Sequence, residues 1–162
     1  MYHHLDFAIS YNNEAEKQTL LAGGYRYLDH VTDVYIEAYG DSLEEAFSHA
    51  AKGTINVMFD INEIRGKSKL EFEVDGHDHS ELLFNWLERI LLLIEIDNKV
   101  MSNFEIKISK LESKYQLTAL TMTESIDLSK HGYRTEIKGV TYHEMEVLQE
   151  GDLNKVRFIL DL

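Results

Sequence analysis

The stretch Tyr27-Leu28-Asp29-His30-Val31-Thr32-Asp33 runs directly into the alternating segment Val34-Tyr35-Ile36-Glu37-Ala38-Tyr39-Gly40. In that segment the side chains at 34, 36 and 38 point to one face of a strand, and those at 35, 37 and 39 point to the other. Two carboxylates and an imidazole therefore stand just before a half-buried strand. Such a group of side chains can converge on a cation or a reacting group, or it can form an ordinary polar turn.

Composition limits the class of protein. The 162 residues are 44% hydrophobic and 28% charged, which suits one globular domain. The absence of cysteine excludes disulfides and thiolate metal sites. No apolar run reaches the roughly 18 residues of a membrane span, and no signal peptide is present, so we expect a cytoplasmic protein with no membrane contact. The net charge of −13 disfavours direct nucleic-acid binding and suits a cation or a basic protein surface, although acidity also serves solubility alone.

Two amphipathic helices are predicted from their caps and apolar spacing. Ser42 with Glu45 forms a capping box, and apolar residues at helical spacing extend from Leu43 to Met58. Asp78 with Glu81 begins a second helix, whose apolar residues between 82 and 94 cover more than one face. The second helix is therefore expected to lie buried at the centre of the molecule.

Strand patterns account for most of the remaining chain. Alternation predicts strands within residues 34–39, 70–74, 104–108, 115–121, 135–147 and 156–160, with a bulge at Gly139 and a short additional strand at 7–11. Mostly consecutive strands with two helices between the early ones indicate an α+β fold, with mostly antiparallel or mixed sheets packed on two helices. Residues 1–24 are interpreted as an N-terminal extension and residues 25–162 as a single domain.

Motifs for common enzyme chemistries are absent. The sequence has no G-x-S-x-G, no Walker A and no G-x-G-x-x-G motif. Lys138 is a cation in a strand pattern of an acidic chain, which fits a salt-bridged edge residue or a functional group equally well. From the residues alone, a hard-cation site, a metal-dependent phosphoester hydrolase and a chaperone-like binding module all stay open.

Several motifs together resemble the archease family over residues 25–162. They are Tyr25-x-Tyr27-Leu28-Asp29-His30-x-x-Asp33, Ala38-Tyr39-Gly40-x-Ser42-Leu43-Glu44-Glu45-Ala46-Phe47, Leu82-Leu83-x-x-Trp86-Leu87, Thr135-Glu136-Ile137-Lys138-x-Val140-Thr141-Tyr142-His143-x-Met145 and the ending Phe158-Ile159-Leu160-Asp161-Leu162. The departures are small: Val31-Thr32 replaces the usual Thr-Ala, and Gly139 stands where alanine is common.

The resemblance implies an accessory protein that is not itself an enzyme. Archeases activate RtcB-type RNA ligases in tRNA splicing by promoting guanylylation of the ligase's active-site histidine, which supports repeated turnover. By position in the motifs, Asp33, Asp161 and Leu162 would hold a divalent cation, with calcium most expected in a structure and magnesium or manganese as alternatives. Lys138 would be a functional residue for activation. Asp29 and His30 would lie beside the cation site.

The sequence also predicts that the α-carboxylate of Leu162 is a cation ligand. This group is ionised at neutral pH because its pKa is about 3.5, and hard cations bind such oxygens readily. Residues appended after Leu162 would replace the carboxylate with a neutral carbonyl, so divalent affinity measured by calorimetry should fall. A tag placed before Tyr25 is the matched control, and equal affinity in the extended and native proteins would contradict the prediction.

Overall fold

The computed structural model describes residues 23–30 and 32–162. The predicted strand at 7–11 and most of the predicted extension lie outside this range. The elements are β1 (Gly24–Leu28), β2 (Val34–Gly40), α2 (Leu43–Met58), the 3₁₀ turn η1 (Ile61–Glu63), β3 (Ser68–Gly76), α3 (His79–Glu95), β4 (Lys99–Lys110), β5 (Tyr115–Ser125), β6 (Gly139–Glu150) and β7 (Leu153–Asp161).

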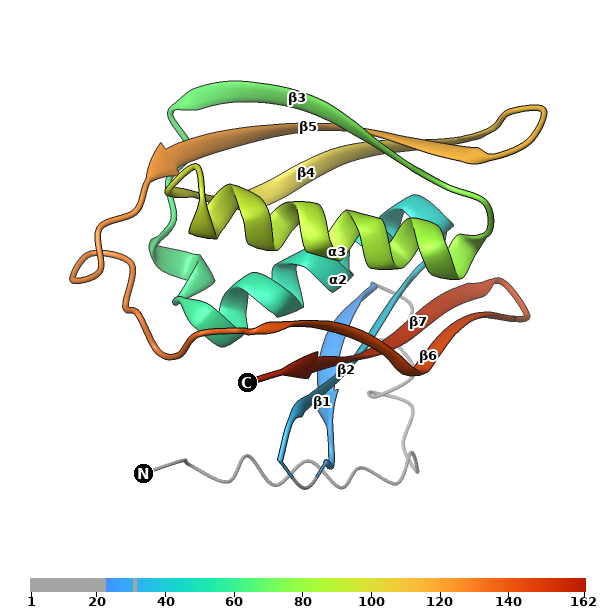
Figure 1. Ribbon diagram of the computed structural model, residues 1–162, viewed down its shortest axis with the longest axis horizontal. Helices are drawn as coiled ribbons and strands as arrows, with labels where there is room; N and C mark the ends of the chain where they lie inside the picture. Colours follow the sequence, from blue (N-terminus) through green and yellow to red (C-terminus); the bar gives the residue numbers. More distant parts are fainter. Residues whose placement is uncertain (1–22, 31) are drawn as a thin grey trace.

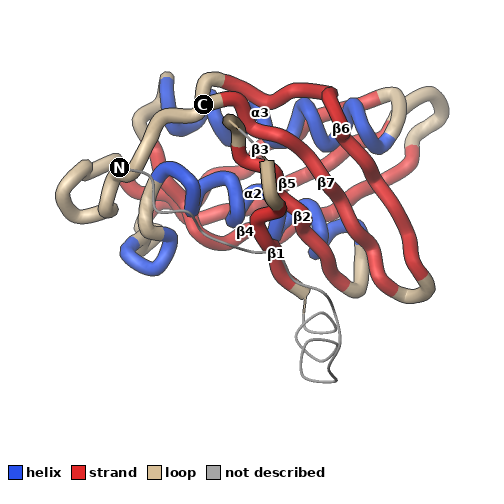
Figure 2. The backbone as a smooth tube through the Cα atoms, turned by 90° about the horizontal axis from the view of Figure 1, so that it is seen from below, coloured by secondary structure: helices blue, strands red, loops and turns tan. Residues whose placement is uncertain are grey.

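The described elements form three layers, with both helices between two sheets (Figure 1). One sheet has the strand order β3-β5-β4, and the other has the order β1-β2-β7-β6. Every strand pairing within both sheets is antiparallel. Viewed from below, the four-stranded sheet lies across the helices with β7 in its interior (Figure 2). The predicted α+β class is confirmed, and the sheets are antiparallel rather than mixed.

Each helix begins with a capping box, shortly after a strand that ends in glycine. At α2, Ser42 Oγ accepts a hydrogen bond from Glu45 N (3.1 Å), and Glu45 Oε2 accepts one from Asp41 N (2.8 Å). A Cβ added to Gly40 would lie 2.5 Å from the Cβ of Glu45, so only glycine lets the helix start this close to the strand. The predicted capping box is thus confirmed.

The second helix, α3, begins with a capping box of the same kind. Asp78 Oδ1 accepts a hydrogen bond from Glu81 N (2.8 Å), and Glu81 Oε2 accepts one from His77 N (2.6 Å). Gly76 ends β3, and a Cβ there would collide with the backbone of Leu82. Both helices are therefore fixed at their first turns, where the backbone N–H groups have no partner within the helix.

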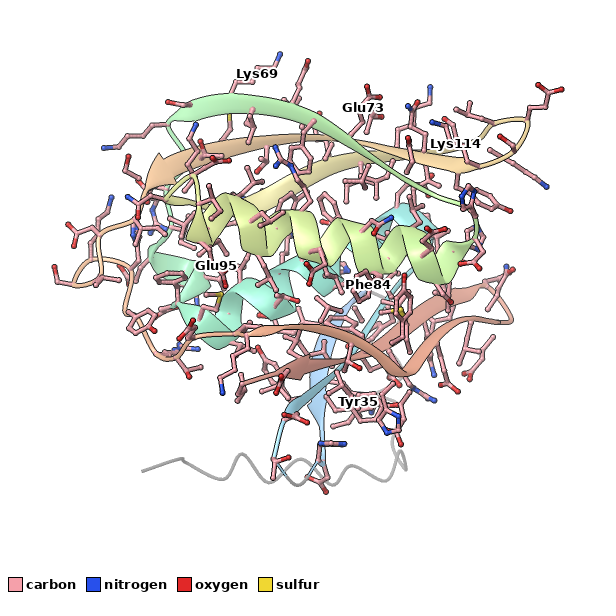
Figure 3. All side chains as sticks on the ribbon, in the orientation of Figure 1. Tyr35, Lys69, Glu73, Phe84, Glu95 and Lys114 are labelled. Atoms are coloured by element: carbon pink, nitrogen blue, oxygen red, sulfur yellow. The ribbon has the colours of Figure 1, made fainter. Side chains whose placement is uncertain are left out.

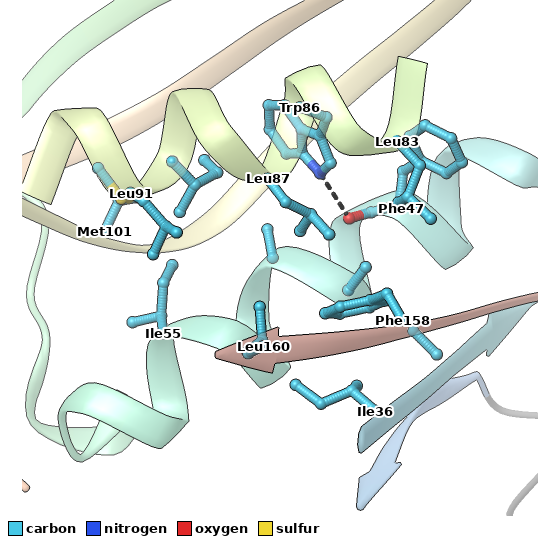
Figure 4. Packing of buried hydrophobic residues seen from close by; sticks show 14 of the residues in the cluster. Ile36, Phe47, Ile55, Leu83, Trp86, Leu87, Leu91, Met101, Phe158 and Leu160 are labelled. Atoms are coloured by element: carbon cyan, nitrogen blue, oxygen red, sulfur yellow. Dashed lines mark hydrogen bonds between the residues drawn. The ribbon is translucent and has the colours of Figure 1, made fainter. Parts of the chain in front are cut away.

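The core lies between the two sheets and is centred on α3. Trp86 is fully buried, and its ring stacks on Phe72 and meets Phe104 edge-on. Its Nε1 donates a hydrogen bond to the carbonyl oxygen of Phe47 on α2 (2.9 Å), which satisfies the one polar atom of the indole (Figure 4). Side chains from β2 and β7, such as Phe158, close the core from the other sheet (Figure 4). The predicted burial of the second helix is confirmed.

A row of alternating charges crosses the outer face of the four-stranded sheet, with one residue on each strand. Glu37 on β2 is fully buried and accepts hydrogen bonds from Arg26 Nε on β1 (2.8 Å) and Arg157 Nε on β7 (2.7 Å). Arg157 Nη1 also donates to Glu146 Oε2 on β6 (3.0 Å). The two guanidinium groups compensate the buried carboxylate, and the row links all four strands in one register.

The bulge of β6 lies later in the strand than the sequence suggests. Gly139 is regularly paired with Asp161, and the register shift falls between Thr141 and Glu146. Glu144, within the shift, has a φ of 55°, which is rare for a residue other than glycine. Pairing resumes at Glu146, the residue held by Arg157. The prediction of a bulge at Gly139 is therefore wrong, because a side-chain bond across the sheet decides where the extra residues are accommodated.

Glu37→Ala should destabilise the fold by about 3–5 kcal/mol, because it removes the buried carboxylate that compensates the positive charges of Arg26 and Arg157. The matched control is Glu146→Ala, which removes an exposed partner of the same arginine and should cost less than about 1 kcal/mol. Urea unfolding of both variants measures the difference. Similar losses of unfolding free energy in the two variants would show that the buried carboxylate of Glu37 contributes no more to stability than the exposed one of Glu146.

Candidate functional site

The last strand places its end between two other segments of the chain. On one side, the register pairs Val34 of β2 with Leu160 of β7. On the other side, Gly139 of β6 pairs with Asp161, and the backbone N–H of Lys138 donates a hydrogen bond to the carbonyl oxygen of Asp161 (2.7 Å). The starts of β2 and β6 thus both meet the end of β7.

The register places the two predicted carboxylates at opposing positions on one face of this sheet. Core side chains on β2 and β7 have even numbers, such as Ile36 and Leu160, so odd-numbered side chains point outward. Asp33 precedes the Val34–Leu160 pair by one residue and Asp161 follows it by one, so they occupy opposite positions on the outward face. The register therefore brings together two residues 128 positions apart in the sequence.

The imidazole of the opening motif lies beside Asp33. His30 Nδ1 is 4.0 Å from Asp33 Oδ2, and the side chains are 25% and 27% exposed. The ring of His30 also meets the ring of Tyr35 edge-on, with centroids 6.2 Å apart. Asp29 is exposed in the same connection between β1 and β2. Figure 3 shows Tyr35 on the side of the sheet away from the helices.

Lys138 and Leu162 both neighbour Asp161, but their side chains differ in exposure. Lys138 is exposed, and within residues 23–30 and 32–162 its amino group forms no ion pair. Leu162 is partly buried, and its side chain packs against the core. Only the main-chain oxygens of Leu162 are therefore suited to a polar role.

The donor set fits a hard cation. Among the described residues no group of three or more His, Cys, Asp or Glu side chains is arranged to hold a metal ion. Two carboxylates are available, at Asp33 and Asp161, so main-chain oxygens and water would have to complete the coordination. Such an all-oxygen set suits calcium, magnesium or manganese and does not suit zinc, which takes nitrogen or sulfur ligands.

Comparison with known proteins assigns the family. The model of the Archease protein family matches residues 25–162. The archease of Pyrococcus abyssi is 39% identical over 123 residues, which cover 76% of this chain and 87% of that protein. The archease of Methanosarcina barkeri is 35% identical over 139 residues, which cover 85% and 95%. The chain belongs to the archease family. The resemblance seen in the sequence motifs is confirmed.

Two solved structures share the archease fold. The solution structure of protein 1598 from Methanobacterium thermoautotrophicum is 34% identical, has a TM-score of 0.75 and covers 86% of this chain and 99% of that one. The crystal structure of an archease from Thermotoga maritima, described as a possible chaperone, is 19% identical, with a TM-score of 0.54 and coverage of 85% and 96%. The second likeness concerns the fold alone. No described helix of this archease is long and apolar enough to cross a membrane.

A buried polar network, which sequence patterns did not indicate, holds the segment that leads to Lys138. His131 is fully buried, and its Nδ1 accepts a hydrogen bond from Asp127 N (2.9 Å). The ring hydrogen therefore lies on Nε2, which donates to Glu124 Oε1 (2.6 Å). Glu124 also accepts from Arg65 N (2.8 Å) and Lys130 Nζ (3.1 Å). The network anchors the connection between β5 and β6 against the rest of this archease.

The same network sets the ionisation of Glu124. Burial by itself raises the pKa of this carboxyl. The hydrogen bonds from Arg65 N, His131 and Lys130 outweigh burial and lower the pKa from 4.5 to about 2. The carboxylate is thus held in its charged form, as its donors require.

Glu124 should make the stability of this archease depend on pH in the acid range. Because its folded pKa is below its unfolded pKa, its contribution is complete above about pH 4.5 and is lost as the pH falls towards about 2. Glu124→Gln should lose stability at neutral pH and show a shallower fall between pH 5 and 2.5. The free energy of unfolding, measured by urea titration across that range, tests this. Parallel curves for the two proteins would contradict it.

Proposed function

We propose that this protein is an accessory factor, not an enzyme, that activates an RtcB-type RNA ligase in tRNA splicing. It promotes guanylylation of the ligase's active-site histidine and so supports repeated turnover. Family membership supports this proposal. The observation that supports it at particular residues is the arrangement of the chain end: the register places Asp33 opposite Asp161, and the backbone N–H of Lys138 donates a hydrogen bond to the carbonyl oxygen of Asp161.

In this proposal Asp33 and Asp161 hold a divalent cation through their carboxylates, and Leu162 adds a main-chain oxygen. When bound, the cation would supply a compact positive charge able to attract phosphate oxygens. His30 Nδ1, 4.0 Å from Asp33 Oδ2, adds a polar group beside that carboxylate, and exposed Asp29 adds negative charge to the same connection between β1 and β2. Among the described residues the exposed amino group of Lys138 forms no ion pair, so it is available to an anionic group of the ligase or its nucleotide.

The acidity of the chain fits a protein partner rather than RNA itself. The net charge of −13 repels a phosphate backbone but attracts the basic surface of a protein that binds RNA. Complementary charge mainly speeds encounter between two proteins, and salt weakens this effect. The proposal therefore assigns no direct nucleic-acid contact and no membrane contact to this chain.

Lys138→Ala should leave the fold intact and remove most of the activation. An exposed lysine contributes within about 0.5 kcal/mol to stability, so any loss of activation reports on function. The measurement is formation of the ligase–GMP adduct by the cognate ligase with GTP and a divalent cation, at substoichiometric amounts of this protein. Lys107→Ala, which alters an exposed lysine on the other sheet, is the matched control.

Four results would contradict parts of this account. Unchanged adduct formation with the wild-type protein would remove ligase activation as the function. Full activation by Lys138→Ala would show that Lys138 is structural. Hydrolysis of phosphoesters by this protein with a divalent cation alone would favour the hydrolase alternative, and suppression of aggregation of unrelated proteins would favour the chaperone-like alternative.

A further inference from the structure

An exposed aromatic ring lies on β6 where the regular pairing with β7 ends. The ring of Tyr142 stacks on Phe84 of α3, with centroids 4.2 Å apart and planes 5° apart. Tyr142 is nevertheless 52% exposed. Because Phe84 covers one face of the ring, the opposite face is open to solvent. Figure 3 shows Phe84 on the side of α3 that faces β6.

The backbone around Tyr142 is held in an unusual shape. Thr141 Oγ1 accepts a hydrogen bond from His143 N (3.1 Å), and Glu144 has a φ of 55°. The ion pair between Glu146 and Arg157 closes the bulge on its far side. Residues other than glycine keep a positive φ only where their surroundings impose it, and such positions concentrate at functional sites. The ring of Tyr142 is therefore presented by a fixed support rather than by a loose loop.

The open ring lies among carboxylates. Partial burial raises the pKa of Tyr142, and the charges of Glu81 and Asp78 at the start of α3 raise it further. Glu144 follows two residues later, with its side chain 49% exposed. His143, between Tyr142 and Glu144 in the sequence, has a side chain that is 73% exposed, and its Nε2 lies 3.9 Å from Glu144 Oε1. An aromatic face close to carboxylates attracts a cation both through the ring quadrupole and through the carboxylate charges.

We propose that the open face of Tyr142 binds an arginine side chain of a basic protein partner. This inference rests on the proposed function, and the partner is the RNA ligase of that proposal. A guanidinium group lies flat on an aromatic ring and bonds to nearby carboxylates at its edge, which an ammonium group cannot do at once. Tyr142 thus supplies a second contact, distinct from Asp33, Asp161 and Lys138.

Tyr142 lies on the edge strand β6, close to the candidate site but on the face of the sheet that is turned towards α3. Tyr142 follows Gly139 by three residues, or about 10 Å along a strand, and Gly139 is paired with Asp161. Asp161 points away from the helices whereas Tyr142 faces Phe84 of α3, so a partner that contacts both points has to wrap around the edge strand β6. A standard protein interface, which buries about 800 Å² on each partner, is large enough for this. An aromatic side chain that is already immobilised loses little conformational entropy when it binds, which is typical of residues that dominate interface energetics.

The test compares three substitutions at one position, using the full chain and the purified ligase. Tyr142→Phe keeps the π face and should bind within twofold of wild type. Tyr142→Leu keeps apolar contact with Phe84 but has no π face, and it should weaken binding by roughly three- to thirty-fold, as should Tyr142→Ala. The matched control is Tyr133→Ala, since Tyr133 is 47% exposed and rests on Phe59 in a different part of the fold. Calorimetry or interferometry at low salt gives the affinities.

The outcomes separate this inference from the proposed function. If wild type binds and activates the ligase while Tyr142→Leu and Tyr142→Ala bind equally well, the inference is overturned and the proposed function stands. If wild type neither binds nor activates the ligase, the proposed function falls and this inference falls with it. Weakened binding by Leu and Ala with retention by Phe, in variants whose urea unfolding matches wild type, supports the arginine contact.

Discussion

The position of β7 between β2 and β6 is the constraint on which the candidate site depends. Backbone pairing alone would allow neighbouring strands to slip, and a slip of one residue would turn every side chain to the opposite face. The row formed by Arg26, Glu37, Arg157 and Glu146 opposes such a slip, because a buried carboxylate without its two arginines is costly. This row of ion pairs thus fixes the register of β7, and with it the position of the chain end.

The helices make that sheet rigid from its other side. Both helices start at capped turns that follow a glycine, and both lie between the two sheets. The bond from Trp86 to the carbonyl of Phe47 joins the two helices inside the core. Groups mounted on a sheet supported in this way keep their positions before any ligand arrives, which lowers the entropic cost of binding. The candidate site and the open ring of Tyr142 both lie on strands of this supported sheet.

Local signals in the sequence indicate both helices and the strands β2 to β7, but they miss β1 (Gly24–Leu28) and do not reveal contacts between distant residues. Ser42 and Asp78 marked the helix starts, because a cap is decided within four residues. Glycine is the local sign of a bulge and therefore indicates Gly139, whereas the register shift lies after Thr141, next to the bond between Arg157 and Glu146. The burial of Glu37 and His131 depends on partners on other elements, which no short pattern reveals. For the site, the family motifs indicate Asp33 and Asp161, and only the register of β2 with β7 shows that they stand at opposing positions.

The central claim is that the register of β7 builds a cation site from Asp33 and Asp161. The most direct measurement is an anomalous difference map from crystals of the protein soaked in Mn²⁺, with crystals of Asp33→Asn treated in the same way. The account predicts one strong peak in contact with the carboxylates of Asp33 and Asp161 and with a main-chain oxygen of Leu162, and loss of that peak in the variant. A well-ordered chain end with no peak there at saturating metal, or a peak that persists in Asp33→Asn, would contradict it.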